Sequence, residues 1–428
     1  MASEHAGKQQ KYLYPSIKTY YAEPLVLVEG KGQRVKDTSG NEYLDCFGGI
    51  LTTSVGHARP EVVDAVCDQV RRIVHTSTCY LNLPILELAE ELARVTPGSL
   101  QKSFFTNSGT EAIETAIASA RYYTKSHWIV SLRHGYHGRS VLATSLTGHA
   151  SWKLPASEPG ITLAHNAYCY RCPFHQTYPG CDLMCARDIE ELIKTTTDGH
   201  IAAFIAEPIQ GVGGFIVPPP EYFKVATEIV KRFGGVFICD EVQTGFGRTG
   251  DFMFGIQHWG VEPDLMVFAK GLANGAPIGA TIARAEIADA WGASTISTFG
   301  GNPVTMTAAV ATLKVMKKEN IPVHVAKMGE KMFAGLRALQ ERYSFLGDVR
   351  GKGLMIGIEM VRDNKAPAPD LATTFMDAAR LEGVLVGKGG LYGNVVRVTP
   401  PMTITEAEVA EALDKFGKAC ARVAGAKQ

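Results

Sequence analysis

The feature that most restricts the fold of this chain is a series of short, continuous apolar runs in its middle part. These runs cover residues 128–132, 202–206, 236–239 and 265–268. Short uninterrupted apolar runs are typical of strands buried on both faces of a parallel sheet. A helical pattern at residues 222–233 separates two of them, and glycines gather where the runs end. We therefore predict an α/β protein with a mostly parallel sheet between helices.

The two ends of the chain differ in pattern from this middle part. Strand-like segments at residues 24–29 and 33–37 come first, and helical patterns follow at residues 60–74, 84–94 and 110–123. Beyond them lie long amphipathic helices at residues 304–318 and 323–343, strands at 353–360 and 395–398, and a last helix from residue 406. We predict a large domain of residues 56–310. Residues 1–55 are expected to join residues 311–428 in a smaller α/β domain.

The charge of the chain bears on its partners. Lys plus Arg and Asp plus Glu are equal at 43 each among 428 residues, so net charge does not favour nucleic acid or an anionic membrane. Residues 1–11 are polar, without the apolar centre of a signal peptide, and no apolar run reaches the roughly 18 residues of a membrane span. We expect a cytoplasmic protein with neither nucleic-acid nor membrane partners.

Two segments next to predicted strands and helices are suited to a ligand. Asn107-Ser108-Gly109-Thr110 precedes a predicted helix, where free backbone N–H groups and hydroxyls can bind an anion. An ordinary helix cap would look the same. Gly135-Tyr136-His137-Gly138 follows a predicted strand, and its tyrosine can lie flat on a planar ring. A turn with a surface tyrosine is the alternative.

Two charged residues directly follow buried apolar runs. Asp240 follows the run at 236–239, where a carboxylate can pair with a positive group, a metal or a ribose. Lys270 follows the run at 265–268 and precedes small residues that leave room for a ligand. Burial lowers the pKa of an amine and makes it a nucleophile. A lysine that extends to solvent is the alternative.

These four features together are what chemistry with pyridoxal 5′-phosphate (PLP) requires. The cofactor needs an anion site for its phosphate, an aromatic side chain on its ring, an acid at its pyridine nitrogen and a lysine for its aldehyde. Each motif alone is weak. Their order on successive strand ends is specific, and we therefore predict a PLP enzyme with Lys270 as its covalent residue.

Over nearly its whole length the chain resembles the class III (subgroup II) aminotransferases of PLP fold type I. The matching segments are Asn107-Ser108-Gly109-Thr110-Glu111-Ala112, Tyr136-His137-Gly138, Ala206-Glu207-Pro208-Ile209-Gln210-Gly211, Asp240-Glu241-Val242-Gln243-Thr244-Gly245, Ala269-Lys270-Gly271 and Thr298-Phe299-Gly300-Gly301-Asn302-Pro303. A further segment, residues 347–357, looks like the type 2 branch of the alanine–glyoxylate aminotransferases. The resemblance implies a large domain with a seven-stranded sheet, and a homodimer or a dimer of dimers.

The resemblance also implies roles for single residues. Lys270 and Asp240 would be catalytic, the first as the covalent and proton-transferring amine, the second as the partner of the pyridine nitrogen. The other cofactor residues would be Ser108, Gly109 and Thr110 at the phosphate, Tyr136 and Val242 on the two ring faces, Gln243 at the phenolic oxygen, and Thr298 at the phosphate of the neighbouring subunit. Arg397 would bind the substrate carboxylate, and Tyr20 and Phe47 would line the pocket.

The resemblance predicts a transaminase that passes an amino group from an amino acid or amine to a small 2-oxo acid, in two half-reactions at one site. Many relatives that use terminal amines carry a glutamate that pairs with the carboxylate-binding arginine. Val212 stands at that position here. An arginine left open in this way favours pyruvate or glyoxylate as acceptor, with alanine among the donors.

Other reactions occur on the same fold, and the cofactor motifs do not separate them. Phospholyases that act on phosphorylated amino alcohols or amino acids share the lysine, aspartate and glutamine, as does dialkylglycine decarboxylase. A binding protein with a degenerate site is disfavoured by the intact Lys270. A nicotinamide dehydrogenase is excluded because no G-x-G-x-x-G segment follows the first strand.

A cluster of cysteines lies outside these motifs. Cys169, Cys172, Cys181 and Cys185 have the close paired spacing of a structural zinc site. Free thiols and disulfides are the alternatives. Because a chain of this size folds without a metal, we expect no metal in the enzyme itself.

Overall fold

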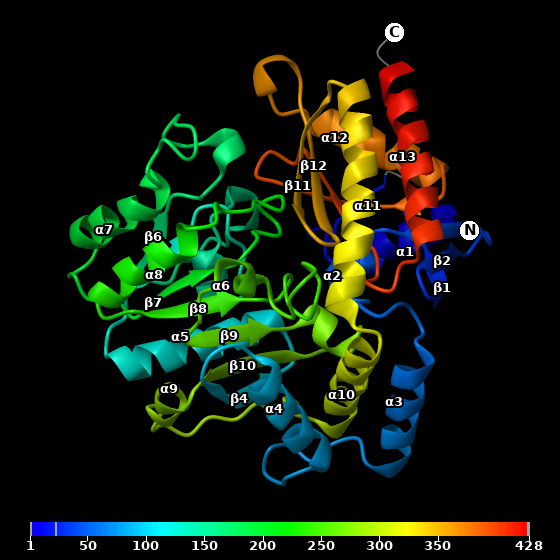
Figure 1. Ribbon diagram of the computed structural model, residues 1–428. Helices are drawn as coiled ribbons and strands as arrows, with labels where there is room; N and C mark the ends of the chain where they lie inside the picture. The colour runs from blue at the N-terminus through cyan, green and yellow to red at the C-terminus, as the bar shows by residue number, and fades with distance from the viewer. Residues whose placement is uncertain (1, 22–23, 426–428) are drawn as a thin grey trace.

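The computed structural model describes residues 2–21 and 24–425. A seven-stranded sheet crosses its larger part, in the order β4-β10-β9-β8-β7-β5-β6 (Figure 1). The strands are β4 (Leu100–Thr106), β5 (Ile129–Leu132), β6 (Ile161–Ala164), β7 (Ala203–Ala206), β8 (Val236–Asp240), β9 (Leu265–Phe268) and β10 (Gly279–Arg284). Neighbours from β6 to β9 pair in parallel, and β10 pairs antiparallel with β4 and β9. The predicted mostly parallel sheet is confirmed.

The sheet is covered by helices on both faces because its central strands are apolar throughout. Every residue of β5, β7, β8 and β9 is buried. Ile205 and Ile238 pack with α5 (Gly109–Thr124) on one face. Phe204 and Phe237, one position earlier in each strand, pack on the other face with α8 (Tyr222–Arg232). The period-two alternation of a strand thus divides one apolar run between two cores.

Further helices surround the sheet. They are α6 (Val141–Leu146), α7 (Met184–Thr196), α9 (Ala285–Asp289), α3 (Pro60–Arg72), α4 (Leu83–Val95) and α10 (Pro303–Lys318). α7 packs on α8, whereas α3 and α4 both pack on α10. The segments α7, β6 and β10 were not predicted. β10 has the sequence Gly-Ala-Thr-Ile-Ala-Arg, in which Ile282 is the only large apolar residue, so it lacks the continuous apolar run that marks the other strands.

The smaller part, at the upper right of Figure 1, is built on a second sheet of order β11-β12-β15-β14. Its strands are β11 (Leu346–Lys352), β12 (Met355–Met360), β14 (Gly387–Gly389) and β15 (Val395–Val398). The helices α11 (Ile321–Arg342), α12 (Pro369–Leu381) and α13 (Glu406–Gly425) stand beside it, with α13 in contact with both others.

The N-terminal strands meet the C-terminal part in a third sheet. It has the order β1-β2-β3-β13, with β1 (Leu27–Lys31), β2 (Arg34–Asp37), β3 (Glu42–Asp45) and β13 (Val384–Leu385). Two short helices, α1 (Ala2–Tyr12) and α2 (Gly48–Leu51), flank these strands in the sequence. The predicted domain limits stay a prediction, and the one at residue 310 lies inside α10. Within residues 2–21 and 24–425, no helix is both long and apolar enough to cross a membrane.

Candidate active site

Four neighbouring strands of the seven-stranded sheet end at one edge. β5, β7, β8 and β9 are adjacent and parallel. Asp240 is the last residue of β8, and the segments after β5, β7 and β9 carry Tyr136, Glu207 and Lys270. Together with the start of α5 these segments enclose a cavity of about 450 Å³. All the predicted cofactor residues except Thr298 line it: Ser108, Gly109, Thr110, Tyr136, Asp240, Val242, Gln243 and Lys270. This edge is where α/β proteins bind ligands.

The N-terminus of α5 forms one end of the cavity. Ser108 is its N-cap, and its hydroxyl accepts the backbone N–H of Glu111 at 3.5 Å, so the simple capping interpretation also holds. Thr110 accepts the backbone N–H groups of Arg139 and Ser140 at 3.2 and 3.1 Å. A side chain at Gly138 would overlap Thr110, so only glycine allows this close approach. The positive end of the helix dipole at this point suits a phosphate.

Lys270 begins the segment that follows β9. Its backbone is left-handed, with φ +41°, and the residue is partly buried. Removal of its amine from water lowers the pKa of Lys270 to about 8, whereas the nearby carboxylates of Asp240 and Glu207 act to raise this pKa. Arg397 acts to lower it. A larger share of the amine is therefore neutral and nucleophilic near neutral pH than in an exposed lysine.

A buried cluster of acids and a histidine lies beside this amine. Asp240 accepts a 2.7 Å hydrogen bond from Nδ1 of His137, and its second oxygen accepts the N–H of Val242 at 3.1 Å. Glu207 accepts the N–H groups of Tyr136 and Gly211 at 3.0 and 2.7 Å. Burial, and then repulsion by Asp240, raises the pKa of Glu207 to about 7.

His137 and Glu207 were quoted in the motifs but were given no role from the sequence. Glu207 follows an apolar run at a strand end, as Asp240 does, and this shared position was the signal that could have identified it. His137 carries no comparable signal, because its approach to Asp240 depends on how the turn after β5 folds back.

The cavity fits the cofactor that the sequence predicts. A side chain at Gly109 would contact Val242 at 3.6 Å, which places Val242 beside the anion site. Tyr136 lines the cavity and packs edge-on against Trp152. Oε1 of Gln243 is buried and has no hydrogen-bond partner among the described residues, so the amide is available to a ligand hydroxyl. The anion site, ring contacts, acid and amine of PLP chemistry are thus together.

A second group of predicted residues meets at Arg397 in β15. Arg397 is 4% exposed, and its Nη2 donates to the hydroxyl of Tyr20 at 3.4 Å. Its guanidinium lies 5.1 Å from the Phe47 ring centre and 5.8 Å from that of Phe215. Nε and Nη1 have no partner, and no carboxylate of the described residues forms an ion pair with them. A buried, unpaired cation is costly and favours an anionic ligand.

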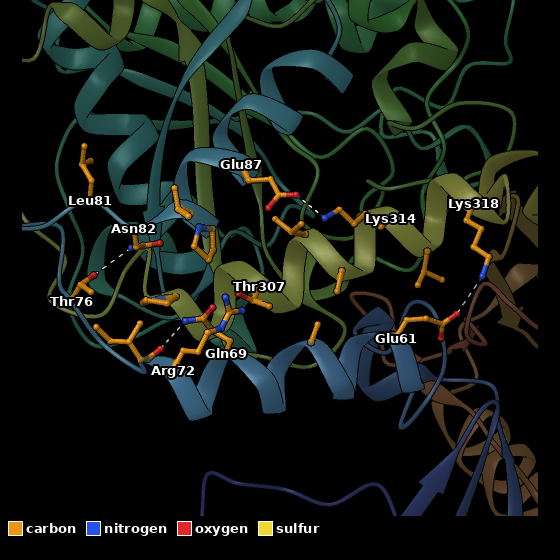
Figure 2. A pocket seen from close by; sticks show the side chains of 18 residues that line it. Glu61, Gln69, Arg72, Thr76, Leu81, Asn82, Glu87, Thr307, Lys314 and Lys318 are labelled. Atoms are coloured by element: carbon orange, nitrogen blue, oxygen red, sulfur yellow. Dashed lines mark hydrogen bonds and ion pairs between the residues drawn. The ribbon is translucent and has the colours of Figure 1, made fainter.

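Thr298 lies apart from the cavity of its own chain. It is exposed, although the neighbouring Ser297 accepts a hydrogen bond from the amide of Asn107 at 3.3 Å. A larger cavity, about 820 Å³, lies between α3, α4 and α10. Figure 2 shows its mixed lining, with Leu81 at one end and the Lys318–Glu61 ion pair at the other. None of the predicted site residues lines this larger cavity.

The cysteine cluster lies in the segment between β6 and α7 and in the first turn of α7, which contains Cys185. All nine cysteines are unpaired. Burial, and then the neighbouring thiols, raises the pKa of Cys185 to about 12. Residues 2–21 and 24–425 contain no group of three or more His, Cys, Asp or Glu side chains arranged to hold a metal ion.

Comparison with known proteins bears on the family. The model of the family described as "Aminotransferase class-III" matches residues 17–420. An alanine–glyoxylate aminotransferase 2 homologue from Arabidopsis thaliana, named as mitochondrial, is 43% identical over 95% of this chain and 86% of its own length. The structure of a PLP-bound amine transaminase from an uncultivated Pseudomonas species is 34% identical, with a TM-score of 0.90 over 96% of this chain and 98% of that one.

A third relative is named for a different activity. The structure of a phospholyase from Arthrobacter in complex with phosphoethanolamine is 29% identical, with a TM-score of 0.90 over 97% of this chain and 99% of that one. The family match nevertheless spans most of the chain and agrees with the site geometry. The chain belongs to the class III aminotransferases, which are PLP-dependent enzymes.

Proposed function

We propose that this aminotransferase transfers the amino group of a small amino acid to pyruvate or glyoxylate, with alanine as a donor to glyoxylate. The observation that supports this choice is the buried Arg397, whose guanidinium has no anionic partner among the described residues. A fork of N–H donors suits a carboxylate, which every one of these substrates carries. The name of the Arabidopsis relative, an alanine–glyoxylate aminotransferase 2 homologue, is consistent with these substrates.

We propose that the cavity residues divide the work as the resemblance implies. When bound, PLP supplies an aldehyde that captures amines and a ring that accepts the electrons of the bond broken at the α-carbon. Ser108, Gly109 and Thr110 hold its phosphate. Lys270 moves the proton between the substrate α-carbon and carbon C4′, since its amine is neutral more often than that of an exposed lysine.

The remaining cavity residues hold the ring. Asp240 keeps a proton on the pyridine nitrogen, and His137 fixes the orientation of its carboxylate through their 2.7 Å hydrogen bond. Tyr136 and Val242 pack on the two faces of the ring, and Gln243 binds its phenolic oxygen. Because donor and acceptor share one carboxylate site, the two substrates must bind in turn, which predicts ping-pong kinetics.

The absence of an acid at residue 212 supports a site that stays open to carboxylates. The Val212 carbonyl accepts the N–H of Gly390 at 2.8 Å, and this contact lies next to Gly389, on which Arg397 packs. A glutamate on this backbone would be close enough to mask the arginine. Valine leaves it unmasked.

Two carbonyl reagents test the role of Arg397 without any assumption about turnover. Aminooxyacetate and methoxyamine both react with the cofactor aldehyde, but only the first carries a carboxylate. In Arg397→Ala the rate with aminooxyacetate should fall, while the rate with methoxyamine stays nearly constant. A lost charge-assisted contact of roughly 2–4 kcal/mol predicts a fall of about 30-fold or more. Equal losses with both reagents would show that Arg397 is only structural.

We further propose that a second copy of the chain covers the face around Thr298. Leu81 and Leu83 are 80% and 81% exposed there, and Phe299 is 62% exposed. The His75 and Phe299 rings lie 5.3 Å apart, and Asn82 donates to the Gly301 carbonyl, so residues 75–83 and 296–301 form one face. Exposed apolar surface of this kind is typical of an interface. Thr298 lies on it and would reach the other copy.

Light scattering at assay concentration tests this assembly. We expect a dimer or a dimer of dimers, and expect Leu81→Asp with Leu83→Asp to give monomers that lose PLP. The control places an aspartate on another exposed leucine, in Leu381→Asp on α12, which should leave the assembly intact. A fully active wild-type monomer would contradict the proposal.

A phospholyase remains the rival activity, because a relative with that name shares the fold. Incubation with pyruvate and candidate amines separates the two: a transaminase forms alanine, whereas a phospholyase releases phosphate and ammonia from phosphoethanolamine. We propose the cytoplasm as the location, although the Arabidopsis relative is named as mitochondrial. Fractionation of the source cells would distinguish these two compartments.

A further inference from the structure

One segment that matches the family has no part in the site so far. It contains Arg350, at the centre of β11. The strand register pairs Arg350 with Gly357 of β12, Gly357 with Arg397 of β15, and Arg397 with Gly387 of β14. Residues that pair directly in antiparallel strands point to the same face of the sheet. Two arginines and two glycines therefore form a single row on one face.

The glycines of this row make room for the Phe47 ring and for the Gly214–Phe215 turn. A side chain at Gly387 would overlap the Phe47 ring. At Gly357 an added Cβ would lie 3.1 Å from the Gly214 carbonyl oxygen and 3.4 Å from the Cβ of Phe215. Phe47 and Phe215 thus each pack over a glycine of the row, and the Arg397 guanidinium lies 5.1 and 5.8 Å from the centres of their rings.

Phe215 reaches this place from the large sheet through an unfavourable backbone conformation. Its φ is +56°, a left-handed value that is rare for a bulky residue, and Gly214 before it has φ +101°. Such a conformation persists only where the surroundings hold it, and it often occurs at binding sites. The contact that holds it from the small sheet is made by Arg350, whose Nε donates to the Gly214 carbonyl at 2.9 Å.

Arg350 is itself held rigidly. Its Nη1 donates to Asp348 at 2.8 Å and to Glu359 at 2.7 Å, and its guanidinium lies 4.9 Å from the Tyr168 ring centre. The Glu359 carboxylate also accepts the hydroxyl of Tyr168 and the Nε of Arg171. These buried ion pairs therefore fix the Nε of Arg350, which donates to the Gly214 carbonyl.

We propose that Arg350 is a positioning residue for the substrate carboxylate. Arg350 holds the Gly214–Phe215 turn over Gly357 and so fixes the Phe215 ring. Because the Arg397 guanidinium lies beside this ring, its position determines the direction in which the free Nε and Nη1 of Arg397 point. This inference rests on the proposed role of Arg397. It adds that the substrate-carboxylate site is set from β11, across the contact between the two sheets.

Two variants test the proposal. Arg350→Lys keeps a positive charge beside Glu359 but cannot bind Gly214 and both acids together. Gly357→Ala keeps every charge and displaces the Gly214–Phe215 turn by a few tenths of an ångström. In both, we expect the ratio of the aminooxyacetate rate to the methoxyamine rate to fall about tenfold, because small misplacements of a binding group are costly. The methoxyamine rate itself should change little.

The control is Arg362→Lys, which alters an exposed ion pair with Asp370 in the same part of the chain. It should leave the ratio unchanged. A ratio that stays at the wild-type value in both Arg350→Lys and Gly357→Ala, while Arg397→Ala lowers it, would overturn this proposal alone. A ratio unchanged in Arg397→Ala would instead overturn the carboxylate role. A melting temperature lowered without any change of ratio would make Arg350 merely structural.

Discussion

The lowered pKa of Lys270 predicts how fast the cofactor-free enzyme captures PLP at each pH. Only the neutral amine attacks an aldehyde. With a pKa of about 8 instead of the usual 10.5, about 9% of the amine is neutral at pH 7 rather than about 0.03%. The capture rate should therefore rise with pH to a midpoint near 8, and at pH 7 the reactive fraction should be about 300-fold above that of an exposed lysine.

Stopped-flow absorbance after mixing with PLP measures this rate. Rates of PLP with N-α-acetyl-lysine at the same pH values, expressed per neutral amine, provide the reference, because dividing by them removes the titration of the cofactor itself. After this correction, a midpoint near 10 would refute the argument that burial controls the amine.

Two variants should move the midpoint in opposite directions. Glu207→Gln removes a carboxylate that raises the pKa of Lys270, so the midpoint should fall below 8. Arg397→Ala removes a cation that lowers this pKa, so the midpoint should rise. If the midpoints of both variants moved in the same direction, or if each moved opposite to its prediction, these charges would not act on the amine as the geometry requires.

Three further predictions concern other residues. Lys270→Ala should still bind PLP through the α5 terminus, seen as cofactor retained after gel filtration, but should lose nearly all turnover; wild-type turnover would overturn the central role of this lysine. Asp240→Asn should slow proton removal from the substrate by several orders of magnitude in single-turnover kinetics, because the ring nitrogen loses its counter-charge. For the thiols around Cys185, elemental analysis of protein purified without added zinc should find no stoichiometric metal, and about one zinc per chain would contradict this.

The cofactor side of the site was predictable because its residues follow recognisable local patterns. Asp240 and Lys270 each follow a continuous apolar run, and such runs mark the strands that end at the binding edge. Ser108 precedes a helix whose start is visible from its own sequence. For these residues, the order along the chain is enough to predict that they lie near one another.

The substrate side was not predictable in this way. The contact of Arg350 with Gly214 joins residues 136 positions apart, one in β11 and the other in a turn after β7. The register that places Gly357 between two arginines depends on which strands pair, and β10 and β14 show how weakly a short or glycine-rich strand is marked in sequence. Family resemblance pointed to Arg397, Tyr20 and Phe47, but only the structure shows the Phe215 ring and the unpaired nitrogens of Arg397.

The cofactor residues and the substrate-binding Arg397 lie in different parts of the chain, and this order has a consequence for synthesis. The cavity residues of the cofactor side run from Asn107 to Ile278, apart from Thr52, whereas the Arg397 row depends on strands that end at Val398. A ribosome working from the N-terminus therefore finishes nearly the entire cofactor pocket well before it adds Arg397. Until Arg397 has been added, the chain lacks the group that anchors a carboxylate, so amino-acid chemistry awaits nearly the whole of synthesis.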